Sequence, residues 1–154
     1  MNMGAITVQV DSASLTQSNS TAITGVVFFD FGNYLFPEEG WNDFVVVVLC
    51  WWLSALKQIA EGCSDSETLR FMGGPLYVTI NKQNNGLCRI DCFDGSTDGC
   101  SEYSGQYPLS DILDSVLCAA TTIYSACFKN GWDNSDLSNL RILMKGFPEG
   151  RINR

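Results

Sequence analysis

The centre of the chain carries a hairpin signal that restricts the fold to a class with antiparallel strands. Residues 76–82 and 87–93 are rich in β-branched and aromatic side chains, and Asn84-Asn85-Gly86 lies between them. An Asn-Gly turn of this kind connects two antiparallel strands. Long apolar segments precede and follow the hairpin. The pattern predicts an α+β fold in which helices cover one face of an antiparallel sheet.

Further strands are expected on both sides of the first long apolar segment. Residues 6–10 alternate between apolar and polar side chains, and residues 23–31 are again β-branched and aromatic, so these two segments are expected to pair. Residues 69–72 are expected to begin another strand before the turn at 73–75. The polar or glycine-containing segments are expected to be loops: residues 12–21, 32–40 and 94–106.

The first apolar segment is expected to be the main helix, over residues 41–61. Asn42 or Asp43 can cap its start, and Gly62 follows its end. The valines at 45–48 are typical of a strand, but apolar residues continue as far as Ile59, which favours a helix. The most apolar part, residues 44–53, is too short to span a bilayer.

Two more helices are expected in the C-terminal third. The first covers residues 108–128, with Ser110 as its cap and Asn130-Gly131 after its end. The second begins at Asn134 or Ser135 and continues to about Lys145. The prediction is therefore a single domain over residues 1–154, with loose termini at 1–3 and 147–154. An antiparallel sheet of about four strands packs against about three helices in this prediction. The 154 residues and 16.9 kDa fit one domain of ordinary size.

The balance of charge narrows the possible partners. The chain has 17 acidic and 9 basic residues, and its formal net charge is −8. Such a surface repels nucleic acid and anionic lipid, so neither nucleic acid nor a membrane is expected as a direct partner. The same field attracts a basic protein and accelerates the encounter. Solubility alone is an equally good reading of the acidic composition.

Composition also removes the commonest enzyme chemistry. The chain has no histidine, so serine–histidine and cysteine–histidine nucleophiles cannot be built. No glycine-rich phosphate-binding motif is present, and no cofactor is expected. Paired carboxylates remain as an acid–base alternative, for which candidates are Glu38 with Glu39, Asp91 with Asp94, and Asp98 with Glu102. Nothing in the sequence marks any pair as buried, so a solvated acidic face is favoured and no catalytic residue is assigned.

The seven cysteines are read as reduced thiols. Their number is odd, and Cys50, Cys118 and Cys127 lie in apolar runs where a thiol packs as a small hydrophobe. Residues 1–10 lack the features of a secretory signal, so the predicted location is cytoplasmic. A zinc site was considered from the spacing of four cysteines: Cys63, Cys88, Cys92 and Cys100. No CxxC pair is present, so packing is preferred and no metal is predicted.

The tryptophans leave two readings open. Trp51 and Trp52 are adjacent in the expected main helix, so their side chains point about 100° apart. A helix buried in the core could hide both rings. Alternatively, one ring reaches the surface and acts as an interface hot spot.

Several motifs together resemble a known group of proteins. Residues 35–44 read LFPEEGWNDF, residues 47–53 read VVLCWWL, and residues 71–78 read FMGGPLYV. Near the end the motif residues are Ala119, Ala120, Cys127, 130–132, Asp136, Leu137 and Leu140. This succession resembles small bacterial immunity proteins that are encoded beside polymorphic toxins of contact-dependent or type VI-delivered systems. The resemblance covers most of residues 35–143, whereas residues 1–30 add nothing specific.

The resemblance implies a protein that binds a cognate toxin domain and blocks it stoichiometrically, without catalysis. From the residues themselves, the expected partner-binding side chains are Asp94, Asp98, Glu102 and Tyr103, with Glu38 and Glu39 as a second patch. The alternative reading is an adaptor or chaperone that escorts a secreted effector without inhibiting it. A small enzyme with carboxylate chemistry is the third reading. Which toxin is bound, and the oligomeric state, stay open.

Overall fold

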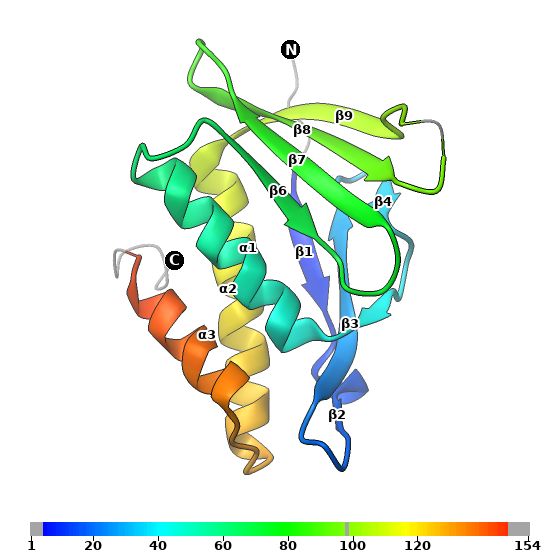
Figure 1. Cartoon of the computed structure of the whole chain (residues 1–154), viewed down its shortest axis with the longest axis vertical. Helices are drawn as coiled ribbons and strands as arrows, with labels where there is room; N and C mark the ends of the chain where they lie inside the picture. Colours follow the sequence, from blue (N-terminus) through cyan, green and yellow to red (C-terminus); the bar gives the residue numbers. More distant parts are fainter. Residues whose placement is uncertain (1–4, 98, 148–154) are drawn as a thin grey trace.

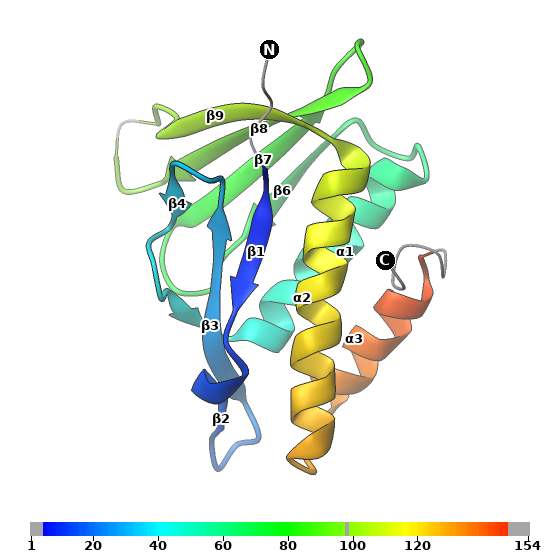
Figure 2. The same cartoon turned by 180° about the vertical axis from the view of Figure 1, so that it is seen from behind.

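The computed structural model describes residues 5–97 and 99–147 as an α+β fold with two antiparallel sheets and three α-helices (Figures 1 and 2). The predicted class, the antiparallel pairing and the three helices are confirmed. In chain order the elements are β1 (Thr7–Val10), the 3₁₀ turn η1 (Ser12–Ser14), β2 (Thr16–Gln17), β3 (Ile23–Asp30), β4 (Leu35–Phe36), β5 (Asn42–Asp43), α1 (Val45–Ala60), β6 (Ser66–Arg70), β7 (Leu76–Lys82), β8 (Leu87–Asp94), β9 (Tyr103–Pro108), α2 (Leu109–Lys129) and α3 (Ser135–Lys145).

The first sheet is built around β3. The strands β1, β2, β4 and β5 all pair with it in antiparallel fashion, and Phe29 of β3 lies opposite Val8 of β1 and Phe36 of β4. The predicted pairing of β1 with β3 is therefore confirmed. The short strands β2, β4 and β5 fall in segments expected to be loops or helix, because two-residue strands leave no alternating pattern to recognise.

The second sheet is a meander in the order β6-β7-β8-β9. The predicted hairpin between β7 and β8 is present, and its register sets Val78 opposite Cys92 and Ile80 opposite Ile90. These side chains are buried on the inner face of the sheet. The expected loop over residues 94–106 is wrong at its end, since residues 103–106 belong to β9. Glycine and serine within this edge strand hide its alternation.

The main helix begins later than predicted. Asn42 and Asp43 are not caps, because they form β5 and pair with Val26 and Gly25 of β3. Phe44 occupies the cap position of α1 without a side-chain hydrogen bond. The backbone of these residues is committed to the sheet, so the helix cannot extend toward Trp41.

The two later helices match the expected boundaries closely. Ser110 lies inside α2 and does not cap it, since Pro108 precedes the first helical residue. Asn134 caps α3 as predicted, and its Oδ1 accepts a hydrogen bond from the Leu137 backbone N–H at 2.8 Å. Its Nδ2 also donates to the Thr21 carbonyl at 2.8 Å, which ties the start of α3 to the β2–β3 turn.

Helix α2 is long and apolar enough, by length and composition alone, to cross a membrane. In this fold its apolar face is buried against β1 and α1, as in the core helix of a globular domain (Figure 2). Ile112, Val116 and Ile123 are among its fully buried residues. The hydropathy of α2 is thus accounted for by packing within the described domain.

Trp52 joins α1 to both sheets. Its ring stacks on Phe29 of β3 at a centroid distance of 4.7 Å and meets Phe71, after β6, edge-on at 5.2 Å. The indole N–H donates to the Arg70 carbonyl at 2.8 Å, so the buried donor is satisfied. One buried side chain of α1 therefore contacts both β3 and the end of β6.

Replacing Trp52 by alanine is expected to lower the free energy of unfolding by about 3–5 kcal/mol, because a large buried ring is lost and a cavity remains. The neighbouring Trp51→Ala variant is the matched control. Trp51 is 43% exposed, so its loss is expected to cost about 1 kcal/mol or less. Urea unfolding followed by circular dichroism measures both. Equal losses for the two variants would contradict this difference in burial.

Candidate protein-binding surface

Most of the predicted partner-binding acids lie along one side of the molecule. Glu38 and Glu39 are exposed in the turn between β4 and β5, Glu102 is exposed just before β9, and Asp94 is half-buried at the end of β8. Figures 1 and 2 both place the β8–β9 connection and the β4–β5 segment on the same side. We name Glu38, Glu39, Asp94 and Glu102 the acidic edge. Asp98 lies outside the described residues.

An aromatic stack holds Glu102 against the first sheet. Tyr34 donates a hydrogen bond from its hydroxyl to Glu102 Oε1 at 3.0 Å, and its ring stacks on Tyr103 at 5.1 Å. Tyr103 in turn stacks on Phe31 at 4.6 Å, and its hydroxyl lies 2.6 Å from that of Tyr107. Tyr103 was predicted as a contact residue; the structure places its half-buried ring inside this stack, between the two sheets.

The environment of this stack favours neutral phenols. Burial, followed by the hydrogen bond to Glu102, raises the pKa of Tyr34 to about 12. Burial, followed by the hydrogen bond with Tyr103, raises the pKa of Tyr107 above its usual range. Tyr34 therefore stays a hydrogen-bond donor to Glu102 at neutral pH, and the carboxylate position is set by the stack.

Asp94 is engaged within its own turn. Its Oδ1 accepts hydrogen bonds from the Ser96 hydroxyl at 2.6 Å and from the Ser96 backbone N–H at 2.9 Å. These bonds favour the charged form and hold the pKa of Asp94 below its usual range. Asp94 thus contributes negative charge to the acidic edge while it shapes the β8–β9 connection.

Asp43 is a buried carboxylate that holds three segments together. It is only 4% exposed, and its Oδ2 accepts hydrogen bonds from the Trp41 indole N–H and the Gly73 backbone N–H, both at 3.0 Å. Its Oδ1 accepts from the Phe44 backbone N–H at 2.7 Å. The carboxylate therefore fixes the β4–β5 turn, the start of α1 and the β6–β7 loop relative to one another. Sequence reasoning treated Asp43 as a possible helix cap and missed this role.

Three large apolar side chains are exposed where these segments meet. Phe44 is 36% exposed, Trp51 is 43% exposed and Met72 is 40% exposed. Phe44 and Trp51 are seven residues apart, so they lie on one face of α1. Met72 precedes Gly73, whose backbone N–H donates to the same Asp43 carboxylate as the backbone N–H of Phe44. We name Phe44, Trp51 and Met72 the apolar patch.

The orientation of Trp51 follows from its two neighbours in the helix. Cys50 faces α3, where its Sγ lies 3.6 Å from the Asp136 carbonyl oxygen, and Trp52 faces β6. Successive side chains of a helix are about 100° apart, which leaves Trp51 on the outer surface between them. Of the two readings of this tryptophan pair, the structure has one ring buried and one at the surface.

The acidic edge adjoins the apolar patch through the β4–β5 turn. The Trp41 backbone N–H donates to the Glu38 carbonyl at 3.2 Å, and the Trp41 indole reaches Asp43. Glu38 and Glu39 are therefore exposed in the turn that leads through β5 to Phe44 at the start of α1. Apolar residues with charged residues at the rim are the usual composition of a protein interface.

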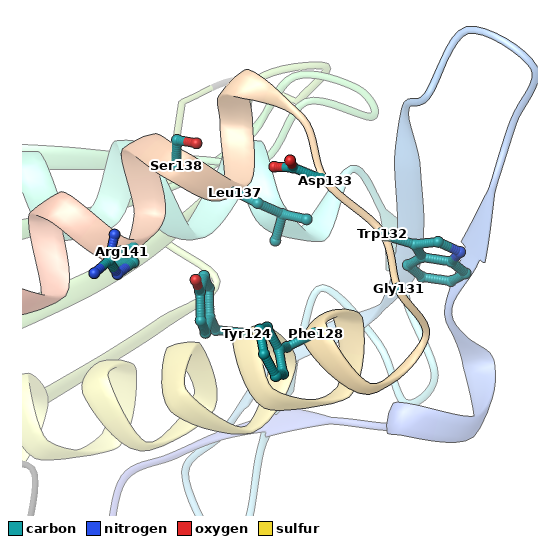
Figure 3. A pocket seen from close by; sticks show the side chains of 8 residues that line it. All are labelled: Tyr124, Phe128, Gly131, Trp132, Asp133, Leu137, Ser138 and Arg141. Atoms are coloured by element: carbon teal, nitrogen blue, oxygen red, sulfur yellow. The ribbon is translucent and has the colours of Figure 1, made fainter.

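A separate groove lies between the C-terminal part of α2 and the start of α3 (Figure 3). Its volume is about 350 Å³. Tyr124 and Phe128 line it from α2, Leu137 points into it from α3, and Arg141 and Asp133 lie toward its two ends (Figure 3). One carboxylate and one guanidinium do not form an acid–base pair.

Of the carboxylates considered from the sequence for acid–base chemistry, Asp91 and Asp94 each have their own structural partners. Asp91 is buried, forms an ion pair with Arg89 at 3.1 Å and accepts a hydrogen bond from the Ser104 hydroxyl. Asp94 caps its own turn and does not share these bonds. Another pair of carboxylates, Asp111 and Asp114, lines a shallow hollow of about 360 Å³ beside β1.

The four cysteines considered for zinc are not gathered at one point. Cys88 and Cys92 are buried on the inner face of the second sheet, and burial raises the pKa of both thiols. Cys63 and Cys100 are exposed. Among the described residues, no three histidine, cysteine or acidic side chains are placed so that they could hold a metal ion.

No family model, curated protein or solved structure matches this chain. The resemblance to immunity proteins therefore stays a hypothesis, and function is inferred from the surfaces described above.

The Asp43→Ala variant is expected to lose about 3 kcal/mol of unfolding free energy, because three N–H donors lose a charged acceptor in a buried place. Glu38→Ala, in the same turn but exposed, is the control and is expected to change stability by about 0.5 kcal/mol or less. Urea denaturation at neutral pH measures both variants. A loss at Asp43 no larger than that at Glu38 would refute the role of this carboxylate.

Stability is expected to fall as the pH rises from about 10 to 12. The pKa of Tyr34 is 10.0 in its reference state and about 12 in the fold, so the unfolded chain releases this proton first. The contribution of neutral Tyr34 to the free energy of unfolding is complete below about pH 10. It decreases as the pH rises from about 10 to about 12. A Tyr34→Phe variant cannot ionise there and should show a flatter pH profile of the urea midpoint. Parallel profiles for variant and wild type would contradict the assignment.

Proposed function

We propose that this protein is an immunity protein that neutralises a cognate bacterial toxin by binding it stoichiometrically. The proposal is carried by one observation: the β4–β5 segment, which carries the exposed Glu38 and Glu39, and the β8–β9 connection, which carries the exposed Glu102, lie on the same side of the fold (Figure 1). The exposed Phe44 follows the first of these segments. An acidic surface of this kind fits a basic partner, such as the substrate cleft of a toxin that acts on an anionic substrate.

Electrostatic attraction supplies the first step of such binding. The net charge of −8 produces a long-range attraction for a cationic protein, and Glu38, Glu39 and Glu102 concentrate exposed charge on the acidic edge. Rim charges act mainly on the association rate constant, which electrostatic steering can raise by about 10–1,000-fold at low salt. A toxin must be neutralised as soon as it is present, so fast association suits this function.

The surface is also held rigid before the partner arrives. The Tyr34–Tyr103 stack positions Glu102, and the buried Asp43 positions the turn that carries Glu38 and Glu39. A surface that is already ordered loses less conformational entropy on binding. Inhibition of this kind needs only occupancy of the toxin surface, and the chain, which has no histidine, needs no bond-making chemistry to achieve it.

An adaptor or chaperone for a secreted effector would bind through a similar surface, and a protection assay separates the two functions. The chain is co-expressed with the protein encoded in the neighbouring reading frame, which on this proposal is the toxin. An immunity protein restores growth and forms a one-to-one complex with the toxin. Binding without restored growth would identify an adaptor and refute neutralisation.

Charge reversal tests the acidic edge directly. The Glu38→Lys/Glu39→Lys/Glu102→Lys variant is expected to lower the association rate constant at low salt by about tenfold or more and to flatten its salt dependence. A control variant with the same change in net charge carries lysine at exposed Glu61 and Asp65, in the α1–β6 connection, and at exposed Asp133, in the α2–α3 turn. Stopped-flow fluorescence over a range of salt concentrations compares the two. Equal effects would show that total charge matters and that the edge does not.

A further inference from the structure

We infer that the apolar patch is the anchor of the toxin-binding surface, and that it receives an apolar side chain flanked by lysine or arginine on the partner. This inference rests on the proposed function. It adds which residues contribute most of the affinity and what kind of side chain the partner presents to them. In protein interfaces a few buried aromatic or large apolar residues carry most of the affinity, and tryptophan is the most enriched among them.

Exposure singles out this part of the surface. The described residues contain five large hydrophobic side chains that are substantially exposed: Phe44, Trp51, Met72, Phe128 and Ile142. Three of the five form the apolar patch. Phe44 precedes α1, Trp51 lies seven residues further along the same helix, and Met72 belongs to the β6–β7 loop, which Asp43 ties to Phe44. Asp43 therefore ties the segment that exposes Phe44 to the loop that exposes Met72.

The patch is held in a fixed shape. Asp43 binds the backbone N–H groups of Phe44 and Gly73, on either side of the junction. A Cβ atom at Gly73 would lie 3.3 Å from the Trp41 ring and 3.5 Å from Asp43 Oδ2, so the loop that carries Met72 packs closely against this junction. Trp52, adjacent to Trp51, anchors α1 in the core. An ordered anchor site of this kind loses little entropy on binding.

Charge selects the kind of occupant. Glu38 and Glu39 are exposed in the turn that leads to Phe44, and Arg70 is directed to the outer face of the second sheet, where its guanidinium carbon lies 5.4 Å from the centre of the Tyr77 ring. A cationic partner segment complements these glutamates. A second copy of the chain would bring the same glutamates and another net charge of −8, so self-association through the patch is opposed.

The experiment compares two places where apolar side chains are exposed. The full chain is prepared as wild type, as Trp51→Ala/Met72→Ala, and as Phe128→Ala, the last removing a 73% exposed ring from the groove between α2 and α3. Binding to the toxin domain from the neighbouring reading frame is followed by surface plasmon resonance. Circular dichroism and urea unfolding establish that each variant is folded.

The patch variant is expected to dissociate about 10–100-fold faster, with little change in the association rate constant. Phe128→Ala is expected to behave as wild type. Glu38→Gln/Glu39→Gln is expected to show the reverse pattern, with slower association, weaker salt dependence and a nearly unchanged dissociation rate. If the patch variant is unfolded, the single Met72→Ala and Trp51→Phe variants give the same comparison with smaller effects.

The outcomes separate this inference from the proposed function. If wild type does not bind the toxin domain, the proposed function fails and the inference fails with it. If wild type binds and protects but the patch variant dissociates at the wild-type rate, only the inference fails. Light scattering tests whether a second copy of the chain binds the apolar patch instead. If the wild type is a dimer and the Trp51→Ala/Met72→Ala variant is a monomer, the patch is a dimer interface and the inference is overturned.

Discussion

The contact of Trp52 with both sheets is the interaction on which the rest of the fold depends. The ring stacks on Phe29 of the first sheet and meets Phe71 at the end of β6, while the indole N–H satisfies the Arg70 carbonyl. Further links between the two sheets include the stacks of Tyr103 on Tyr34 and on Phe31, and the hydrogen bond from Gly73 to Asp43. An uncompensated change at Trp52 would therefore disturb the relative position of the sheets, and with it the surface formed where they meet.

The proposed binding surface lies at this junction of the two sheets. Asp43 is buried and accepts three hydrogen bonds, whereas Glu38, Glu39 and Glu102 are exposed. The buried carboxylate thus stabilises the fold, whereas the exposed carboxylates present negative charge to a partner. The division follows from burial, because a buried carboxylate must be fully hydrogen-bonded, whereas an exposed one is solvated by water. Apolar side chains at the same junction can then supply affinity, while the exposed acids steer the approach.

Local patterns were sufficient for the long elements but not for the short ones. The β7–β8 hairpin, the two long helices and the Asn134 cap follow from residues adjacent in sequence. The start of α1 was misplaced because Asn42 and Asp43 are good capping residues whose backbone is used by β3 instead. Strand β9 was missed because Gly105 interrupts its pattern and its order comes from pairing with β8. In both cases a partner distant in sequence overrides local preference.

The sequence by itself determined the class of the fold, the acidic character of the surface and the absence of histidine chemistry, since these follow from composition and local periodicity. Only the tertiary structure decided that Trp52 is buried while Trp51 is exposed, because the rotation of α1 depends on which sheets and helices surround it. It likewise decided that Glu102 meets Tyr34 and that the Gly73 backbone N–H meets the Asp43 carboxylate. Such contacts join residues far apart in the chain, and no local pattern encodes them.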